Sequence, residues 1–230
     1  MDFSTLKAAA GWFKDGWYIF LKNMPMLIIF SIILSFCLFL FIWMGLSSGG
    51  TFIAFIFYFL LLSILITSWC FLSLRAVRGE ELKVSYLFSG FSDFWRICIT
   101  FAIFNIMIGI GYTLFILPGI FLTLKFGASL FASMDKRFSP IETFQFSNKI
   151  TKGNMVALLW AFIIGYLLVG FSAGFFILGL RDLGTQYGDN LIVIGIIPYI
   201  IFVLVVFPFV GTSFAVAYES LLTKSNGGVE

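Results

Sequence analysis

Six long apolar stretches set the strongest limit on how this chain folds. A membrane-spanning helix needs roughly 20 apolar residues, and stretches of about that length recur along the sequence, at 24–46, 51–74, 97–117, 120–134, 154–178 and 191–222. With 61% hydrophobic and 11% charged residues and a mean hydropathy of +1.08, the chain is far more apolar than a soluble domain. The sequence therefore predicts an all-α fold, an integral membrane bundle of six transmembrane helices that forms one domain over residues 1–230.

The distribution of basic residues predicts how these helices are oriented. The first two stretches are joined by the short link Ser-Ser-Gly-Gly at 47–50, which forces an antiparallel hairpin. Of the 14 lysines and arginines, Lys125 lies inside a stretch and Arg181 lies in an outer connection. The others fall in the segments that a cytoplasmic N-terminus would place inside, where lysine and arginine are enriched. We therefore expect three hairpins with both termini cytoplasmic.

Each predicted hairpin follows a segment that mixes aromatic and charged residues. The pattern Phe-x-Asp-x-Trp precedes the first and second hairpins, and Phe-x-Asn precedes the third. Such segments are typical of amphipathic interfacial helices, although aromatic residues also gather at the ends of most spans. We expect interfacial helices over 3–17, 83–96 and 139–150, with rings toward lipid and charges in water. The last of them begins with the form of a capping box, from Ser139 to Glu142.

Residues 117–159 carry several local signals in a recognisable order. The sequence LPGIFLTLKFGASLFASMDKRFSPIETFQFSNKITKGNMVALL contains a Pro-Gly turn, a short charged link, a Ser-Pro helix start and a Gly-Asn pair before the next span. This order resembles the bacterial inner-membrane proteins called YciC-like and related six-span families. The resemblance implies the six-span architecture and a location in a bacterial inner membrane, and it implies no particular activity.

Polar residues within the predicted spans define the candidate functional site. Pro118 and Gly119 are expected to break the helix between the third and fourth spans, because proline lacks the amide that a continuing helix needs. The candidate intramembrane polar site consists of Lys125, Tyr112, Asn105 and Tyr199. Ionisable groups inside a membrane often mark functional sites. The alternatives are hydrogen bonds that pack helices together and a lysine that snorkels toward the headgroups.

Small residues and prolines mark the fifth and sixth spans. Gly170 and Gly174 form a GxxxG pattern, which lets helix backbones approach closely. The pattern predicts helix packing, either within the chain or between subunits. Pro198 and Pro208 would interrupt the sixth span, as in the broken helices of transporters, although proline kinks also occur in ordinary spans.

The sequence offers no set of residues suited to catalysis or to a bound cofactor. It contains no histidine, the commonest general base and metal ligand. A paired carboxylate in the spans, a nucleophile elbow and a phosphate loop are all absent. Cys37, Cys70 and Cys98 lie in or beside apolar runs and are expected to be packing residues. We expect no catalytic residue, no cofactor, no metal site and no enzymatic activity.

These observations leave two classes of function open. One is a non-enzymatic structural, membrane-organising or partner-binding role, whose partners are the lipid bilayer and, beyond it, other membrane or cytoplasmic proteins or a second copy of the chain. The net charge of +3 gives no reason to expect nucleic acid. The alternative is a small channel or transporter with a path between the hairpins. A water-accessible cavity lined by Asn105, Tyr112 or Tyr199 would favour transport, and a solid bundle would favour the structural role.

Overall fold

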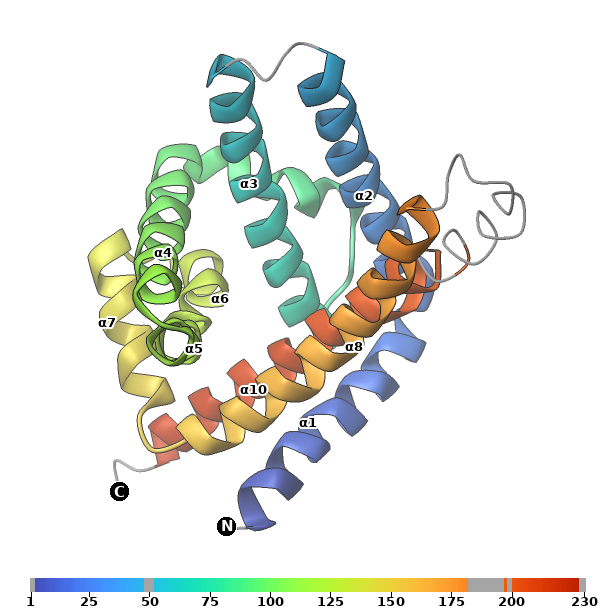
Figure 1. Ribbon diagram of the computed structural model, residues 1–230. Coiled ribbons are helices and arrows are strands. Elements are labelled where there is room, and N and C mark those ends of the chain that lie inside the picture. Colours follow the sequence, from blue (N-terminus) through green and yellow to red (C-terminus); the bar gives the residue numbers. More distant parts are fainter. Residues whose placement is uncertain (1–2, 48–51, 182–196, 198–199, 228–230) are drawn as a thin grey trace.

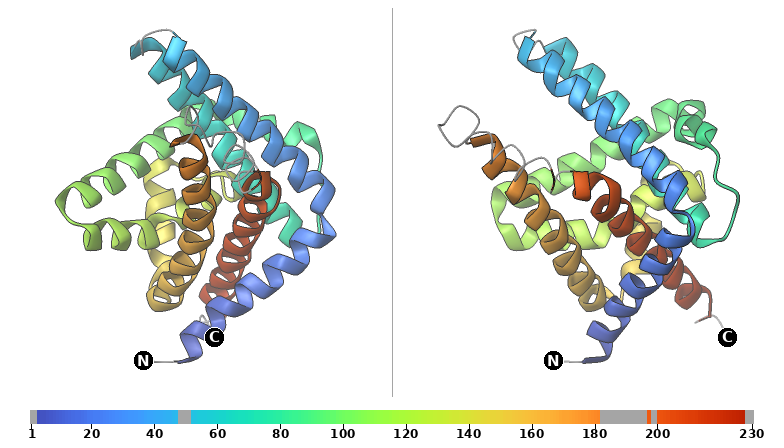
Figure 2. Two further views of the ribbon diagram at one scale, coloured as in Figure 1. Left: turned by 45° about the vertical axis from the view of Figure 1, so that its right-hand side comes forward. Right: turned by 90° about the vertical axis from the view of Figure 1, so that its right-hand side faces the viewer.

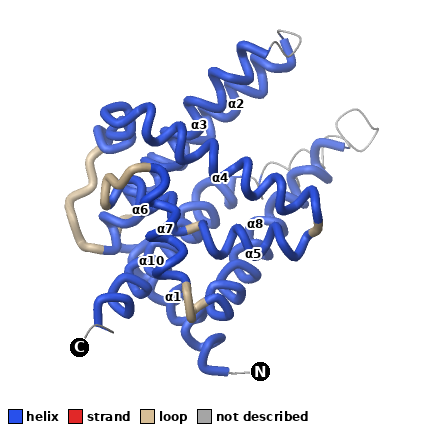
Figure 3. The backbone as a smooth tube through the Cα atoms, turned by 90° about the vertical axis from the view of Figure 1, so that its left-hand side faces the viewer, coloured by secondary structure: helices blue, strands red, loops and turns tan. Residues whose placement is uncertain are grey.

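The computed structural model describes residues 3–47, 52–181, 197 and 200–227, and every regular element among them is helical (Figures 1 and 3). The elements in chain order are α1 Phe3–Lys22, α2 Met24–Ser47, α3 Phe52–Val77, the 3₁₀ helix η1 Val84–Asp93, α4 Phe94–Leu114, α5 Ile116–Phe126, α6 Ala128–Asp135, α7 Pro140–Thr151, α8 Met155–Arg181, the π-helical turn η2 Phe202–Val206 and α10 Phe207–Gly227. The all-α prediction is confirmed for these residues.

Several of these helices are long and apolar enough to cross a membrane. In the described part of the chain four segments qualify by length and composition: Phe59–Val77, Val84–Leu114, Ile116–Asp135 and Phe202–Ser225. Two further pairs qualify only when taken together: α1 with the first part of α2, bent by 94°, and α7 with the first part of α8, bent by 101°. The chain is thus a multi-span membrane protein with four to six spans, and the arrangement of six spans in three hairpins stays a prediction.

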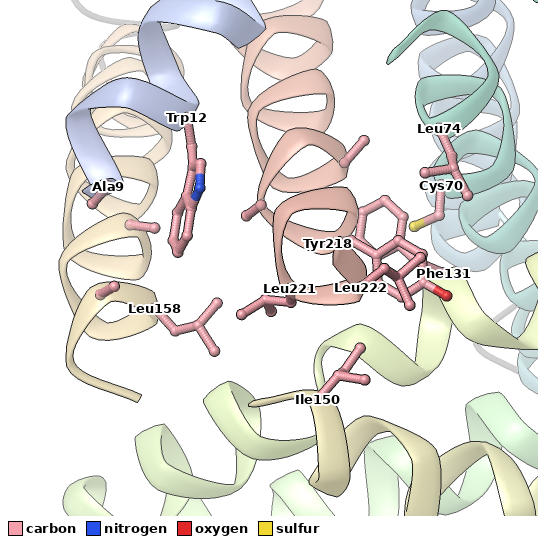
Figure 4. Close-up of a cluster of buried hydrophobic side chains, with 14 of the residues drawn as sticks. Ala9, Trp12, Cys70, Leu74, Phe131, Ile150, Leu158, Tyr218, Leu221 and Leu222 are labelled. Carbon is pink, nitrogen blue, oxygen red and sulfur yellow. The ribbon is translucent and has the colours of Figure 1, made fainter. Parts of the chain in front are cut away.

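The helices pack in three groups. Helices α1, α8 and α10 lie side by side, α2 lies against α3, and α4 to α7 cover the opposite flank (Figures 1 and 2). Helix α10 contacts both α1 and α3, so it joins the groups at the centre of the molecule. The core around it contains large buried side chains from several helices, including Trp12, Tyr218 and Leu221 (Figure 4). The start of α1 and the end of α10 lie at the same end of the bundle.

Helix α1 is amphipathic, but its apolar stripe faces protein. Ala9, Trp12, Phe13, Gly16 and Phe20 recur at helical spacing and are buried. A Cβ atom on Gly16 would lie 2.7 Å from the Cα of Ser213, so this glycine lets α1 and α10 touch. The hydroxyl of Thr212 also donates to the carbonyl of Gly16, at 3.1 Å.

The expectation that the rings of this segment face lipid is therefore wrong for half of them. Trp12 and Phe13 are 6% and 8% exposed, whereas Phe3 and Trp17 are 75% and 42% exposed. Helical periodicity identifies an apolar stripe, and it does not distinguish a protein neighbour from a lipid one. Here α10 supplies the neighbour.

The other two segments predicted as interfacial helices differ from each other. The second forms the 3₁₀ helix η1, which runs directly into α4 and has no side-chain cap. The third forms α7 with the predicted capping box: the backbone N–H of Ser139 donates to the Glu142 carboxylate at 2.9 Å, and the N–H of Glu142 donates to the Ser139 hydroxyl at 3.4 Å. Hydrogen bonds from Ser139 hold the pKa of Glu142 below its usual value.

The break between the third and fourth predicted spans lies three residues before Pro118. Helix α4 ends at Leu114, Phe115 is extended, and α5 begins at Ile116. Pro118 lies in the first turn of α5, where a missing amide costs nothing. Gly119 leaves room for the ring of Tyr112, because a Cβ atom at this position would lie 2.5 Å from that ring. The predicted break at Pro118 and Gly119 is thus corrected to Phe115.

Candidate functional site

The predicted intramembrane polar residues do not converge on a common point. The amide of Asn105, an exposed residue, donates to the Phe101 carbonyl of its own helix at 2.8 Å. Tyr112 is 41% exposed and covers Gly119. Within the described residues no hydrogen bond or ion pair joins Asn105, Tyr112 and Lys125, and Tyr199 lies outside those residues.

Lys125 is held by aromatic rings at its head and by α7 at its backbone. Its Nζ atom lies 5.6 Å from the ring centroid of Phe121 and 5.4 Å from that of Phe126, a cation–π arrangement. Its carbonyl accepts hydrogen bonds from the hydroxyls of Ser147, at 2.9 Å, and Thr151, at 3.2 Å. The backbone of Lys125 therefore docks α7 onto α5, independently of the charge of its side chain.

An ion-pair network joins the ends of α3 and α6 to the middle of α10, and sequence reasoning did not assign it. Arg78, just after α3, donates from Nη1 to Asp135 at the end of α6 at 2.6 Å, and from Nη2 to Glu219 of α10 at 3.0 Å. The hydroxyl of Tyr218 donates to the second oxygen of Asp135 at 3.1 Å. Lys136 approaches the same oxygen at 3.5 Å. We call Arg78, Asp135, Tyr218 and Glu219 the Arg78 network.

Burial makes the Arg78 network more than a surface feature. The Asp135 side chain is 6% exposed, and Tyr218 is 2% exposed in the core around α10. The hydrogen bond with Asp135 is the main reason that the pKa of Arg78 is raised above its already high usual value. Both oxygens of Asp135 are thus occupied by donors from other helices, which satisfies a carboxylate withdrawn from water.

A second arginine ties the link between α6 and α7 to α4. Arg96 donates from Nη2 to Asp93 at 2.8 Å, and from Nη1 to the carbonyls of Ser133 and Phe138, the latter at 3.3 Å. Arg137 also approaches Asp93, at 3.7 Å, and is largely exposed. This cluster lies around the start of α4 and the link after α6, and it makes local structural contacts.

An apolar cavity of about 500 Å³ lies between α3, α5, α6, α8 and α10. Its walls include the side chains of Trp69, Phe131, Phe162, Tyr166, Phe214 and Tyr218. None of Asn105, Tyr112 and Lys125 belongs to the described lining. The cavity is therefore not lined by the described polar residues that would have favoured transport, and the bundle is not the solid one that would have favoured a structural role.

The helix-packing prediction at Gly170 and Gly174 finds no supporting contact. A Cβ atom on Gly170 would meet nothing within 4 Å, and the surroundings of Gly174 lie outside the described residues. Gly165, five residues earlier than Gly170, fills the packing role instead, because a Cβ atom there would lie 3.1 Å from the ring of Phe214. Helix α8 thus contacts α10 through Gly165.

The cysteines and acids show no arrangement suited to a metal ion in the described part of the chain. Cys70 and Cys98 are buried, and the sulfur of Cys98 lies 3.1 Å from the Ser63 hydroxyl. No group of three or more potential metal ligands occurs among the described residues. A comparison with models of known protein families, with curated proteins and with solved structures finds no match for this chain.

Proposed function

We propose that this multi-span membrane protein has a non-enzymatic structural, membrane-organising or partner-binding role in a bacterial inner membrane. The observation that carries the proposal is the set of contacts that the intramembrane polar residues make. The Asn105 amide bonds to its own helix, the backbone of Lys125 docks α7, and neither residue lines the cavity. These polar groups support packing, and none is presented to a substrate.

The charged groups support the same reading. Catalysis and ion-coupled transport both need titratable groups within reach of a reacting or transported species. In the Arg78 network the carboxylates are already paired with Arg78, at 2.6 Å and 3.0 Å. Their contacts join α3, α6 and α10, so their evident effect is to fix these helices relative to one another.

The exposed face of α1 is a suitable surface for headgroups or for a partner. Lys7 and Lys14 are exposed there together with Trp17 and Tyr18. Basic residues beside amphipathic rings suit the membrane interface, where lysine meets phosphate and the rings enter the headgroup region. In our proposal this face lies on the cytoplasmic side, with both termini.

Flux measurements on the reconstituted protein test this proposal. The protein is placed in liposomes of phosphatidylethanolamine and phosphatidylglycerol, and proton and potassium movement are followed with fluorescent indicators. We expect the rates of empty liposomes, with a known ionophore as positive control. Flux that depends on the protein and is lost when the cavity is filled by Val210→Phe would contradict the structural role.

One observation favours the alternative of a channel or transporter. The π-helical turn Phe202–Val206 adjoins α10 just before Pro208, and both Phe202 and Phe207 line the cavity. Helix irregularities of this kind are frequent at functional sites. In this alternative the interrupted helix would move to open the cavity, and protein-dependent flux in the liposome experiment would be its signature.

A further inference from the structure

We propose that the apolar cavity holds one acyl chain of a membrane phospholipid. This inference deepens the proposed membrane-organising role and rests on it, because it assigns the bundle a lipid as its bound partner. The cavity has a volume of about 500 Å³, within the range of roughly 300–1,000 Å³ typical of small-molecule sites. The chemistry and the length of the walls decide which kind of molecule fits.

The walls suit hydrocarbon and are unsuited to water. Four lining residues carry hydroxyl groups, and three of these already donate elsewhere: Thr123 to the Gly119 carbonyl at 2.8 Å, Thr151 to the Ser147 carbonyl at 2.8 Å, and Tyr218 to Asp135 at 3.1 Å. The fourth belongs to Tyr166, which is 68% exposed. A buried water needs two to four polar partners, and an apolar cavity without them stays dry. An ion or a polar solute would lose its hydration there without replacement.

The cavity is at least as long as one leaflet of a bilayer. Its lining extends from Leu158 to Val169 on α8 and from Phe207 to Leu221 on α10, which at 1.5 Å per residue is about 16 Å and about 21 Å. One leaflet contributes about 15 Å, half of the roughly 30 Å hydrocarbon core. A single acyl chain therefore fits along the cavity, whereas a second helix of about 10 Å diameter would need α8 and α10 to separate, and these two helices touch at Gly165 and Phe214.

Access for a lipid chain lies beside Tyr166. This residue lines the cavity and is 68% exposed, so it stands between the cavity and the surroundings of α8. Tyr218 also lines the cavity and is fixed through its hydrogen bond with Asp135 to the Arg78 network. A chain would thus enter laterally from the bilayer and lie against a tyrosine that the ion pairs hold in place.

Native mass spectrometry with a matched pair of variants tests the inference. Delipidated protein in mild detergent is incubated with palmitoyl-oleoyl phosphatidylglycerol, palmitoyl-oleoyl phosphatidylethanolamine and palmitic acid at equal concentration. We expect one phospholipid per chain to remain bound at collision energies that strip all others. Val210→Phe, which fills the cavity, should lower this occupancy at least 10-fold. Val156→Phe, at a residue that is 53% exposed and outside the lining, should leave it unchanged.

A second readout keeps the inference testable if Val210→Phe fails to fold. One equivalent of phosphatidylglycerol with a brominated acyl chain should quench Trp69, which lines the cavity, so Trp69→Phe should remove most of the quenching. Trp95→Phe, at a residue that is 71% exposed, should not. The inference is overturned if no phospholipid is retained, if palmitate is retained instead, or if the protein forms a dimer without lipid. It is also overturned if Val210→Phe and Val156→Phe retain equal amounts of phospholipid. In each of those cases the liposome experiment can still show no protein-dependent flux, so the lipid-binding inference can be wrong while the proposed function stands.

Discussion

At the end of α3, Arg78 meets carboxylates from α6 and α10, whereas the ammonium of Lys125, within the Ile116–Asp135 segment, lies against two aromatic rings. The first cation is held by carboxylate acceptors that other helices supply. The second has a four-carbon stem that can carry its charge toward the headgroups. These two regions show two ways in which an apolar bundle accommodates a positive charge.

The difference between the two regions is energetic. A fixed ion pair at a helix end joins elements, and removal of one partner leaves the other charge uncompensated and partly buried. A charge that reaches the interface by its own flexible stem needs no partner, and its removal frees no buried group. The Arg78 network should therefore matter greatly for stability, and the charge of Lys125 should matter little.

The largest effect should follow from Asp135→Ala. The substitution deprives Arg78 and Tyr218 of their shared acceptor, and we expect a loss of about 3 kcal/mol in the free energy of unfolding, the low end of the range for a broken buried pair because Arg78 keeps Glu219. Unfolding in mixed micelles measures it. Lys136→Ala, at a contact of 3.5 Å on a half-exposed side chain, is the control and should cost less than about 1 kcal/mol. Equal losses of unfolding free energy in the two variants would show that Asp135 contributes no more to stability than an ordinary surface ion pair.

A smaller loss is expected from Arg96→Met. Methionine keeps the apolar stem, but the hydrogen bonds to Asp93 and to the carbonyls of Ser133 and Phe138 disappear. We expect a cost of about 2 kcal/mol, since a hydrogen bond with a charged partner contributes about 1.5–3 kcal/mol and the groups left behind are only partly buried. Arg137→Met, at a residue 72% exposed, should change stability by less than about 0.5 kcal/mol. An effect at Arg137 as large as that at Arg96 would speak against a fixed contact.

Ser147→Ala separates the backbone role of Lys125 from its charge. The variant removes one of two hydrogen bonds to the Lys125 carbonyl and leaves Thr151 as the other donor. We expect a loss of about 1 kcal/mol, the usual net value of one neutral hydrogen bond. Ser220→Ala, whose hydroxyl bonds within α10, is the matched control and should be nearly neutral. No difference between the serine variants would mean that α7 does not depend on this contact.

The smallest effect is predicted for Lys125→Met. Methionine retains the packing of the stem and loses only the charge and the cation–π contacts, which contribute about 0.5–1 kcal/mol at an exposed site. The release of a charge from the span offsets this loss, so the free energy of unfolding should change by less than about 0.5 kcal/mol. A methionine variant that folds normally but loses a bound anion or a biological phenotype would instead identify Lys125 as a functional site.

Local sequence signals predicted part of this structure well. The capping box at Ser139 and Glu142 was predictable because both partners lie within one helical turn. The extended residue Phe115 was not, because Pro118 indicates that a helix is interrupted without fixing the residue at which the break falls. A proline in the first turn of a helix and a proline after its end look alike in a sequence.

The candidate site was harder to predict than the helices. Arg78 is separated from Asp135 by 57 residues and from Glu219 by 141. Each is an ordinary charge near the end of a predicted apolar stretch, and that shared position was the available signal. Lys125 stood out because a charge inside an apolar stretch is rare. The rarity of a residue in its sequence context did not reveal which charges the fold brings together.

The most direct test of the account is the membrane topology of the charged end. If the bundle has six spans and the Arg78 network lies on the cytoplasmic side, a reporter that is active only in the periplasm should be silent when inserted after Gly79 or after Gly153. The same reporter inserted between residues 184 and 188, outside the described residues, should be active. Activity after Gly153 would place the link between α7 and α8 on the other side of the membrane and would contradict the account.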